Sequence, residues 1–183
     1  MSGLYQRRVE QEWHLLRSLV DANPGLLEIR GRRNSQGDEV FDFNLHQTQA
    51  LIEAAGGLTV RDSHQVSVHF PSFFPSVPLE ASLVEPVFHP NIHPENGFVC
   101  LWGGFSSADT IVEALCQLQR ILTWQLVNEQ PDHLMQPAAL AWLKDHNRQV
   151  SLPLIGQPVR KPDGFALANT YARRPDGVRR RLS

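Results

Sequence analysis

A thiol and a side-chain amide lie close together near the middle of the chain. Asn91 follows His89 and Pro90, and Cys100 comes one short turn later. A cysteine thiolate can exchange with another thioester and hold the acyl group in a form that is still activated towards amines. An amide N–H aimed at the carbonyl oxygen can stabilise the negative charge that develops there. The pairing therefore indicates a reaction site with Cys100 as the candidate nucleophile, and a buried core cysteine is the alternative for this residue.

The order His-Pro-Asn over 89–91 followed by Cys100 resembles the active-site signature of ubiquitin-conjugating enzymes. The resemblance extends over about 5–146 and includes a strand that runs into a Pro-rich loop over 65–78. It implies an α+β fold with an N-terminal helix, a four-stranded antiparallel meander sheet and C-terminal helices. It also implies an enzyme that accepts a ubiquitin-like protein from an activating enzyme as a Cys100 thioester and transfers it to an amine acceptor. We expect no cofactor.

The resemblance gives the residues before Cys100 distinct roles. Asn91 is expected to donate a hydrogen bond to the oxyanion, and bracing of the nearby loop is the alternative. His89 and Pro90 are expected to support the turn. For His89, a hydrogen bond to the backbone is favoured over a direct role in acid–base catalysis.

A substrate lysine must lose a proton before it attacks, which favours a nearby carboxylate. Asp132 is the nearest match to the acidic residue that the family places after its second helix. The neighbouring position, where a second carboxylate is common, reads His133. A solvated aspartate in a turn is the alternative for Asp132, so the choice of amine stays open.

Two partner surfaces of the family can be compared with this sequence. Arg7 and Arg8, near the start of the first helix, would suit an acidic patch on an activating enzyme, although an ordinary solvated helix start is the alternative. At the surface for ring-type ligases, the family has an aromatic residue and a Ser-Pro-Ala, whereas this chain reads Ser76 and Ser-Ser-Ala over 106–108. The missing anchor predicts a ligase-independent pathway, as in a bacterial ubiquitin-like conjugation system.

Other kinds of site fit parts of the pattern. A non-catalytic module of the same fold would bind a ubiquitin-like protein without a thioester, but such relatives lack the cysteine. His89, His93 and Cys100 could bind a metal ion, yet a fourth ligand is not evident, and we expect no metal. Cys116 is expected to be a packing residue or an unreactive thiol.

Helices are predicted before and after the site in the sequence. Apolar residues at helical spacing predict a helix over 5–22, ended by Asn-Pro-Gly over 23–25. A second helix is predicted from Thr110, with a weak capping box formed by Ser106 and Asp109. The predicted core positions of the two helices are Val9, Trp13, Leu16 and Val20 in the first, and Ile111, Leu115, Leu118 and Leu122 in the second. A third helix is predicted over about 137–146.

Strands must lie between the first two helices. Alternation of apolar and polar residues predicts strands over 41–45 and 66–70, and a short strand is predicted over 81–84. Glycines over 31–37 and 56–57 predict turns.

Charge divides the 183-residue chain into two predicted parts. Over 1–150, ten Lys and Arg face seventeen Asp and Glu, whereas over 151–183 seven face two. We therefore expect a catalytic domain over 1–150 and a basic, Pro-containing arm over 151–183. Two cysteines make no disulfide framework, and no apolar run is long enough for a membrane span. A cytoplasmic protein is expected, with neither nucleic acid nor membrane as a partner.

Overall fold

The structure is a computed structural model that describes residues 3–145 and 151–162. Helix α1 (Gly3–Ala22) forms because residues at helical spacing bury one stripe of the helix. That stripe consists of Tyr5, Val9, Glu12, Leu16 and Leu19. The predicted helix over 5–22 is confirmed, although Trp13 and Val20 are only partly buried. The described residues include no helix with the length and hydropathy that crossing a membrane requires.

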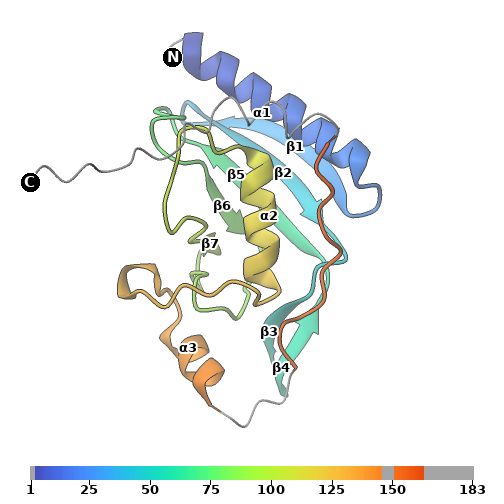
Figure 1. The fold of residues 1–183 in the computed structure, drawn as a ribbon, viewed down its shortest axis with the longest axis vertical. Coiled ribbons are helices and arrows are strands. Elements are labelled where there is room, and N and C mark those ends of the chain that lie inside the picture. Colours follow the sequence, from blue (N-terminus) through green and yellow to red (C-terminus); the bar gives the residue numbers. More distant parts are fainter. Residues whose placement is uncertain (1–2, 146–150, 163–183) are drawn as a thin grey trace, which may run out of the picture.

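The main sheet has five antiparallel strands in the order β1-β2-β5-β6-β7 (Figure 1). Its strands are β1 (Leu27–Ser35), β2 (Asp38–Leu45), β5 (His64–Phe70), β6 (Glu80–Leu83) and β7 (Phe98–Val99). Buried and less buried residues alternate along β5, as expected for a strand with one covered face. The predicted four-stranded meander is confirmed. The fifth strand, β7, is too short to produce a periodic pattern in the sequence.

A second, two-stranded sheet extends beyond the main one. It pairs β3 (Ala50–Ala54) with β4 (Gly57–Arg61), and Gly57 adopts φ +114° at the turn. The predicted turn at 56–57 is confirmed, but the flanking strands were not predicted. The predicted turn over 31–37 was too wide, because β1 continues to Ser35 and only Gln36 and Gly37 connect it to β2.

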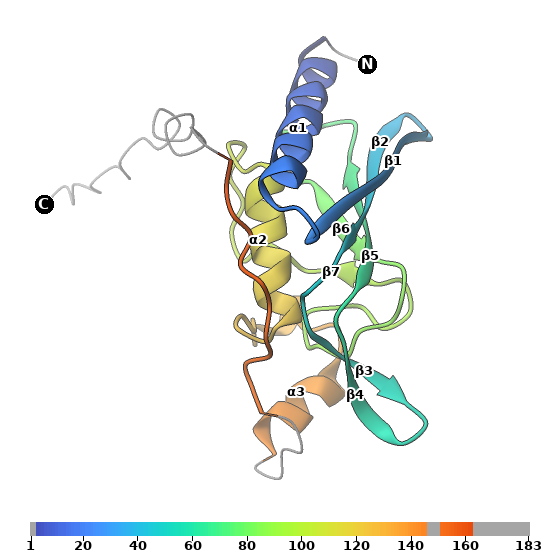
Figure 2. The ribbon, with the colours of Figure 1, turned by 90° about the vertical axis from the view of Figure 1, so that its right-hand side faces the viewer.

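Helix α2 (Ile111–Leu122) covers the inner face of the main sheet (Figures 1 and 2). Its capping box is formed by Thr110 and Glu113, so the prediction of Ser106 and Asp109 was wrong. Asp109 instead accepts the Ser106 N–H at 2.8 Å in the turn before the helix.

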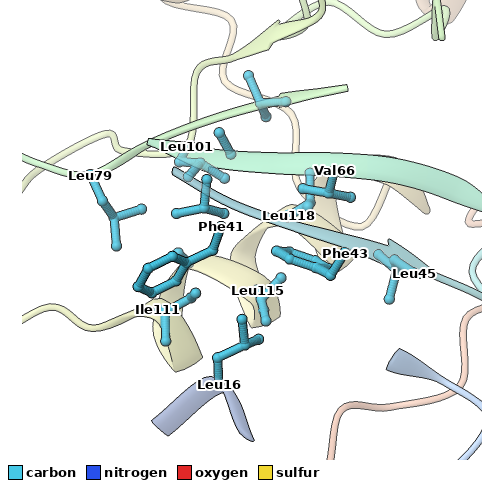
Figure 3. Close-up of a cluster of buried hydrophobic side chains, with 14 of the residues drawn as sticks. Leu16, Phe41, Phe43, Leu45, Val66, Leu79, Leu101, Ile111, Leu115 and Leu118 are labelled. Carbon is cyan, nitrogen blue, oxygen red and sulfur yellow. The ribbon is translucent and has the colours of Figure 1, made fainter. Parts of the chain in front are cut away.

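All four predicted core positions of α2 are buried: Ile111, Leu115, Leu118 and Leu122. Figure 3 shows Ile111 and Leu115 facing Phe41 and Phe43 of β2, with Leu16 of α1 below them. The core therefore lies where the sheet, α1 and α2 meet.

A smaller hydrophobic cluster lies beyond the end of α2. It contains Phe88, Trp124 and Trp142, with the Trp124 and Trp142 ring centroids 5.4 Å apart. Trp142 belongs to α3 (Pro137–Lys144), which follows the 3-10 turn η1 (Pro131–His133). The third predicted helix is confirmed, and it ends at Lys144 rather than near residue 146.

Residues 151–162 form an extended segment that lies against the domain, which we call the C-terminal strap (Figure 2). Leu154 is buried in the smaller cluster, and its N–H donates to the Thr123 carbonyl at 2.8 Å. The Arg160 N–H donates to the Asn23 side chain at the end of α1 at 2.7 Å. This part of the predicted arm is therefore docked on the domain, while 163–183 lie outside the described residues.

Candidate active site

Cys100 directly follows β7 and is half-buried. Its N–H donates to the Asn91 carbonyl at 2.9 Å, and Ile92 bridges to Val99. Gly97 permits this reversal because it adopts φ +68° and its carbonyl accepts the Leu83 N–H at 2.9 Å. The two halves of the predicted motif are therefore joined by backbone hydrogen bonds.

His89 lies fully buried beneath this loop. Its Nδ1 accepts the Asn91 N–H at 3.1 Å, and its ring centroid is 4.6 Å from that of Trp124. Burial lowers the pKa of His89 to about 3, so the imidazole is neutral at physiological pH. A neutral, buried ring that binds the backbone fits a supporting role.

Asn91 is also buried, and its whole side chain is engaged. Nδ2 donates to the carbonyls of Asn128 and His133 at 2.7 and 3.0 Å. Oδ1 accepts the Asn128 N–H at 2.8 Å. In this conformation both amide hydrogens bind backbone, which supports loop bracing. The oxyanion role of Asn91 stays a prediction that requires one of these bonds to open.

Pro90 supports the same loop through its carbonyl. That oxygen accepts the N–H groups of Met135 and Gln136 at 2.8 and 3.1 Å. The Gln136 amide donates in turn to the carbonyls of Val87 and Ile92. The segment after η1 is thus fixed against both sides of the 89–91 tripeptide.

A histidine lies at the thiol. His133 Nδ1 is 2.9 Å from Cys100 Sγ. In the sequence, His133 is noticeable only as a departure from the family pattern. No local signal places a residue of η1 beside Cys100, which is 33 positions earlier in the chain. The contact is created by the bonds of Asn91 and Pro90 to the segment that carries His133.

Asp132 is exposed beside this pair, in η1. Burial, and secondly the negative charge of Asp132, raise the pKa of the Cys100 thiol. The site therefore favours the neutral thiol in the absence of a base. The role of Asp132 in orienting an amine stays a prediction.

The two predicted partner-binding arginines differ. Arg7 is exposed, and its Nε donates to the Gly3 carbonyl. Arg8 points inward instead. Its Nε lies 2.9 Å from the buried Glu12 carboxylate, and its Nη2 donates to the Asp109 carbonyl at 3.2 Å. This side chain joins α1 to the turn before α2, and its contact with an activating enzyme stays a prediction.

The Pro-rich loop keeps an aromatic residue at the surface. Phe73 is 75% exposed, and Phe105, before α2, is 37% exposed. Ser76 is exposed as well, so a serine stands at the surface where the resemblance expects an aromatic anchor, and the loss of that anchor stays a prediction. The nearby Trp102 is fixed by donation from its Nε1 to the Leu79 carbonyl at 3.1 Å.

Residues 29–150 match the family model described as "Ubiquitin-conjugating enzyme". The chain belongs to the ubiquitin-conjugating enzyme family. Within this family match lie the His-Pro-Asn tripeptide, Cys100 and η1. Over the described residues, no group of three His, Cys, Asp or Glu side chains is arranged to bind a metal ion.

Solved structures assigned to ubiquitin-conjugating enzymes share the fold. One from Trypanosoma cruzi has a TM-score of 0.53 and 15% identity, covering 80% of this chain and 92% of that chain. One from Plasmodium yoelii has a TM-score of 0.50 and 20% identity, covering 76% and 84%. A comparison with curated proteins found no match. At these identities the similarity to the solved structures shows the fold alone, so the chemistry must be argued from the site.

Proposed function

We propose that this ubiquitin-conjugating enzyme family member accepts a ubiquitin-like protein on Cys100 and transfers it to an amine. The single observation that carries the proposal is the position of Cys100. Its thiol is half-buried, its backbone N–H binds the His-Pro-Asn turn, and its sulfur lies 2.9 Å from a ring nitrogen of His133. A cysteine that served only to pack the core would need neither the turn nor the histidine.

The reaction has two acyl transfers. In the first, Cys100 Sγ attacks the carbonyl carbon of the thioester on an activating enzyme, a C–S bond forms, and the activating enzyme's thiol leaves with a proton. In the second, an amine nitrogen attacks the same carbon, a C–N bond forms, and the C–S bond to Cys100 breaks. The substrate ammonium group gives up one proton to solvent before it attacks, and the departing Cys100 sulfur takes the second proton from the nitrogen. We assign to Asp132 the role of orienting the incoming amine.

The partners follow from these steps. The exposed Arg7 is the candidate contact for an acidic patch on the activating enzyme. Discharge to free amine without a ligase is the proposed pathway, and a bacterial ubiquitin-like conjugation system is the proposed setting. No chemical step here calls for a cofactor on this chain, because the activating enzyme supplies the energy of the thioester.

A loading assay tests the proposal. The full chain, a ubiquitin-like protein, its activating enzyme and ATP should give one shifted band on a nonreducing gel that disappears when thiol is added. Cys100→Ser should give a thiol-resistant oxyester or no adduct, and Cys116→Ala should load like the parent. An adduct on Cys100→Ala would show that the nucleophile is another residue.

The same assay separates catalysis from binding. A non-catalytic module of this fold would retain the ubiquitin-like protein in a native binding experiment but form no thiol-sensitive adduct. Binding without an adduct, observed with an activating enzyme that is itself charged, would contradict the transferase proposal.

A further inference from the structure

We propose that His133 is a further catalytic residue of this site, the base that takes the Cys100 proton as sulfur attacks the incoming thioester. The inference deepens the proposed function and rests on it. The observation behind it is the 2.9 Å separation between Cys100 Sγ and His133 Nδ1, a hydrogen-bond distance to the reacting atom.

The environment of Cys100 creates the need for a base. The thiol is half-buried, and burial and the charge of Asp132 both disfavour the thiolate. Only the thiolate exchanges readily with a thioester. Imidazole is the side chain whose ordinary titration falls nearest to neutral pH, so it can accept the proton that the site would otherwise leave on sulfur.

The fold holds the pair together through Asn91. The Asn91 carbonyl accepts the Cys100 N–H, and the Asn91 side chain donates to the His133 carbonyl. One residue thus binds the backbone of both the thiol and the imidazole. The His133 N–H also donates to the Gln130 carbonyl at 3.0 Å within η1. These bonds hold the backbone of His133 beside the thiol.

The proton balance of the step is complete. Nδ1 of the neutral His133 ring takes the proton of Cys100 while Sγ forms its bond to the thioester carbon. The C–S bond to the activating enzyme then breaks, and its thiolate receives the proton from the imidazolium. His133 returns to its neutral form, and no oxidant or further reactant is consumed. Asp132 disfavours the thiolate and therefore opposes this first transfer. Its proposed role lies in the later attack by the amine.

Alkylation by iodoacetamide tests the pair without any partner protein. The full chain carrying Cys116→Ala leaves Cys100 as its only thiol, and its alkylation rate is measured from pH 5.5 to 9.5. The parent rate should level off at a lower pH than that of His133→Gln, which can hydrogen-bond to the thiol but cannot act as a base. At pH 7 we expect the parent to react at least about tenfold faster.

Two further variants separate catalysis from structure. Adding imidazole to His133→Ala should restore part of the alkylation rate, which a purely structural histidine would not allow. Asp132→Asn should react faster than the parent, the opposite direction from His133→Gln. Equal alkylation profiles for the parent and His133→Gln, with both folded by circular dichroism, would overturn the inference.

Loading measured on the same variants keeps the two proposals apart. If His133→Gln alkylates slowly and also loads slowly from a charged activating enzyme, both stand. If its alkylation is slow but the parent forms no thioester with a charged activating enzyme, the pair exists and the proposed function fails. If the parent loads and His133→Gln loads equally fast, the base role fails and the proposed function stands.

Discussion

At the scale of single residues, the site is organised around Asn91. This side chain binds the backbone of Asn128 and His133, while the backbone carbonyl of Asn91 accepts the Cys100 N–H. The three side-chain bonds are partly buried, so removing the amide leaves polar backbone groups without partners. Leaving a buried polar group unpaired costs about 1–3 kcal/mol. Removing a side chain that braces the loop should therefore lower the free energy of unfolding, whereas removing a side chain that is only an oxyanion donor should not.

Asn91→Ala should lower the free energy of unfolding by about 3 kcal/mol, because several buried hydrogen bonds are lost together. Urea denaturation followed by tryptophan fluorescence measures this. The control is Asn96→Ala, which removes an exposed acceptor for the Phe98 N–H and should cost at most about 1 kcal/mol. Unchanged stability of Asn91→Ala combined with slow discharge to amines would favour the oxyanion role instead.

Glu12 gives a second prediction for a single residue. This carboxylate is fully buried, accepts the Ile111 N–H at 2.8 Å and faces Arg8. Burial raises its pKa to about 7, although those two partners oppose the shift. The pKa of Glu12 in the folded protein exceeds the ordinary value of 4.5, so the protonated carboxyl contributes stability that is fully present below pH 4.5. This contribution is lost as the pH rises through 7.

Glu12→Gln, which stays neutral, should therefore gain stability relative to the parent by up to about 3 kcal/mol between pH 4.5 and 7.5. Denaturation at several pH values measures the difference. Glu10→Gln is the control. Arg32 lowers the pKa of the exposed Glu10, so this substitution should not gain stability relative to the parent as the pH rises. A stability difference for Glu12→Gln that does not vary with pH would contradict the shift.

At the scale of elements, the short strand β7 delivers Cys100 to the site. It pairs with β6, and the turn before it approaches the β6 backbone so closely that only glycine fits. A Cβ built on Gly97 would lie 1.9 Å from the Leu83 carbonyl oxygen, and Gly97 also adopts a positive φ. Both the conformation and the space at this position exclude a side chain.

Gly97→Ala should lower the free energy of unfolding by about 3 kcal/mol or more, through the clash and the positive φ together. Gly37→Ala is the matched control, since Gly37 has φ +95° but nothing within 4 Å of an added Cβ. It should cost about 1–2 kcal/mol from conformation alone. Thermal denaturation compares the two, and equal losses would mean that the close approach to Leu83 relaxes without cost.

At the scale of the whole molecule, the C-terminal strap joins parts that no single strand or helix connects. It binds the end of α1 through Asn23, the segment before β3 through Gln47 and Gln49, and the end of α2 through Thr123. Gln119 on α2 adds bonds to the Gln157 carbonyl and the Val159 N–H. Although its composition is that of a solvated arm, the strap therefore contributes to the packing of the domain.

Leu154→Ala should destabilise the protein by about 2–5 kcal/mol, because the side chain is buried in the cluster with Phe88 and Trp124. The neighbouring Ile155 is 74% exposed, so Ile155→Ala should change stability by at most about 0.5 kcal/mol. Urea denaturation of the two variants is the test. Equal, small effects would show that the strap is peripheral and that the boundary predicted at residue 150 describes the domain better.

Local signals along the chain were enough to locate several elements. Helical spacing located α1 and α2, alternation located β2 and β5, and the His-Pro-Asn tripeptide with Cys100 marked the site. The contacts of these residues became clear only once the elements were packed together. His133 meets Cys100, and Arg8 turns towards Glu12, through contacts between segments far apart in the chain. The strap docks because buried backbone and Leu154 find partners on distant segments. Periodicity and composition describe a residue's immediate neighbours in the chain, whereas partners across the fold depend on how all the elements pack.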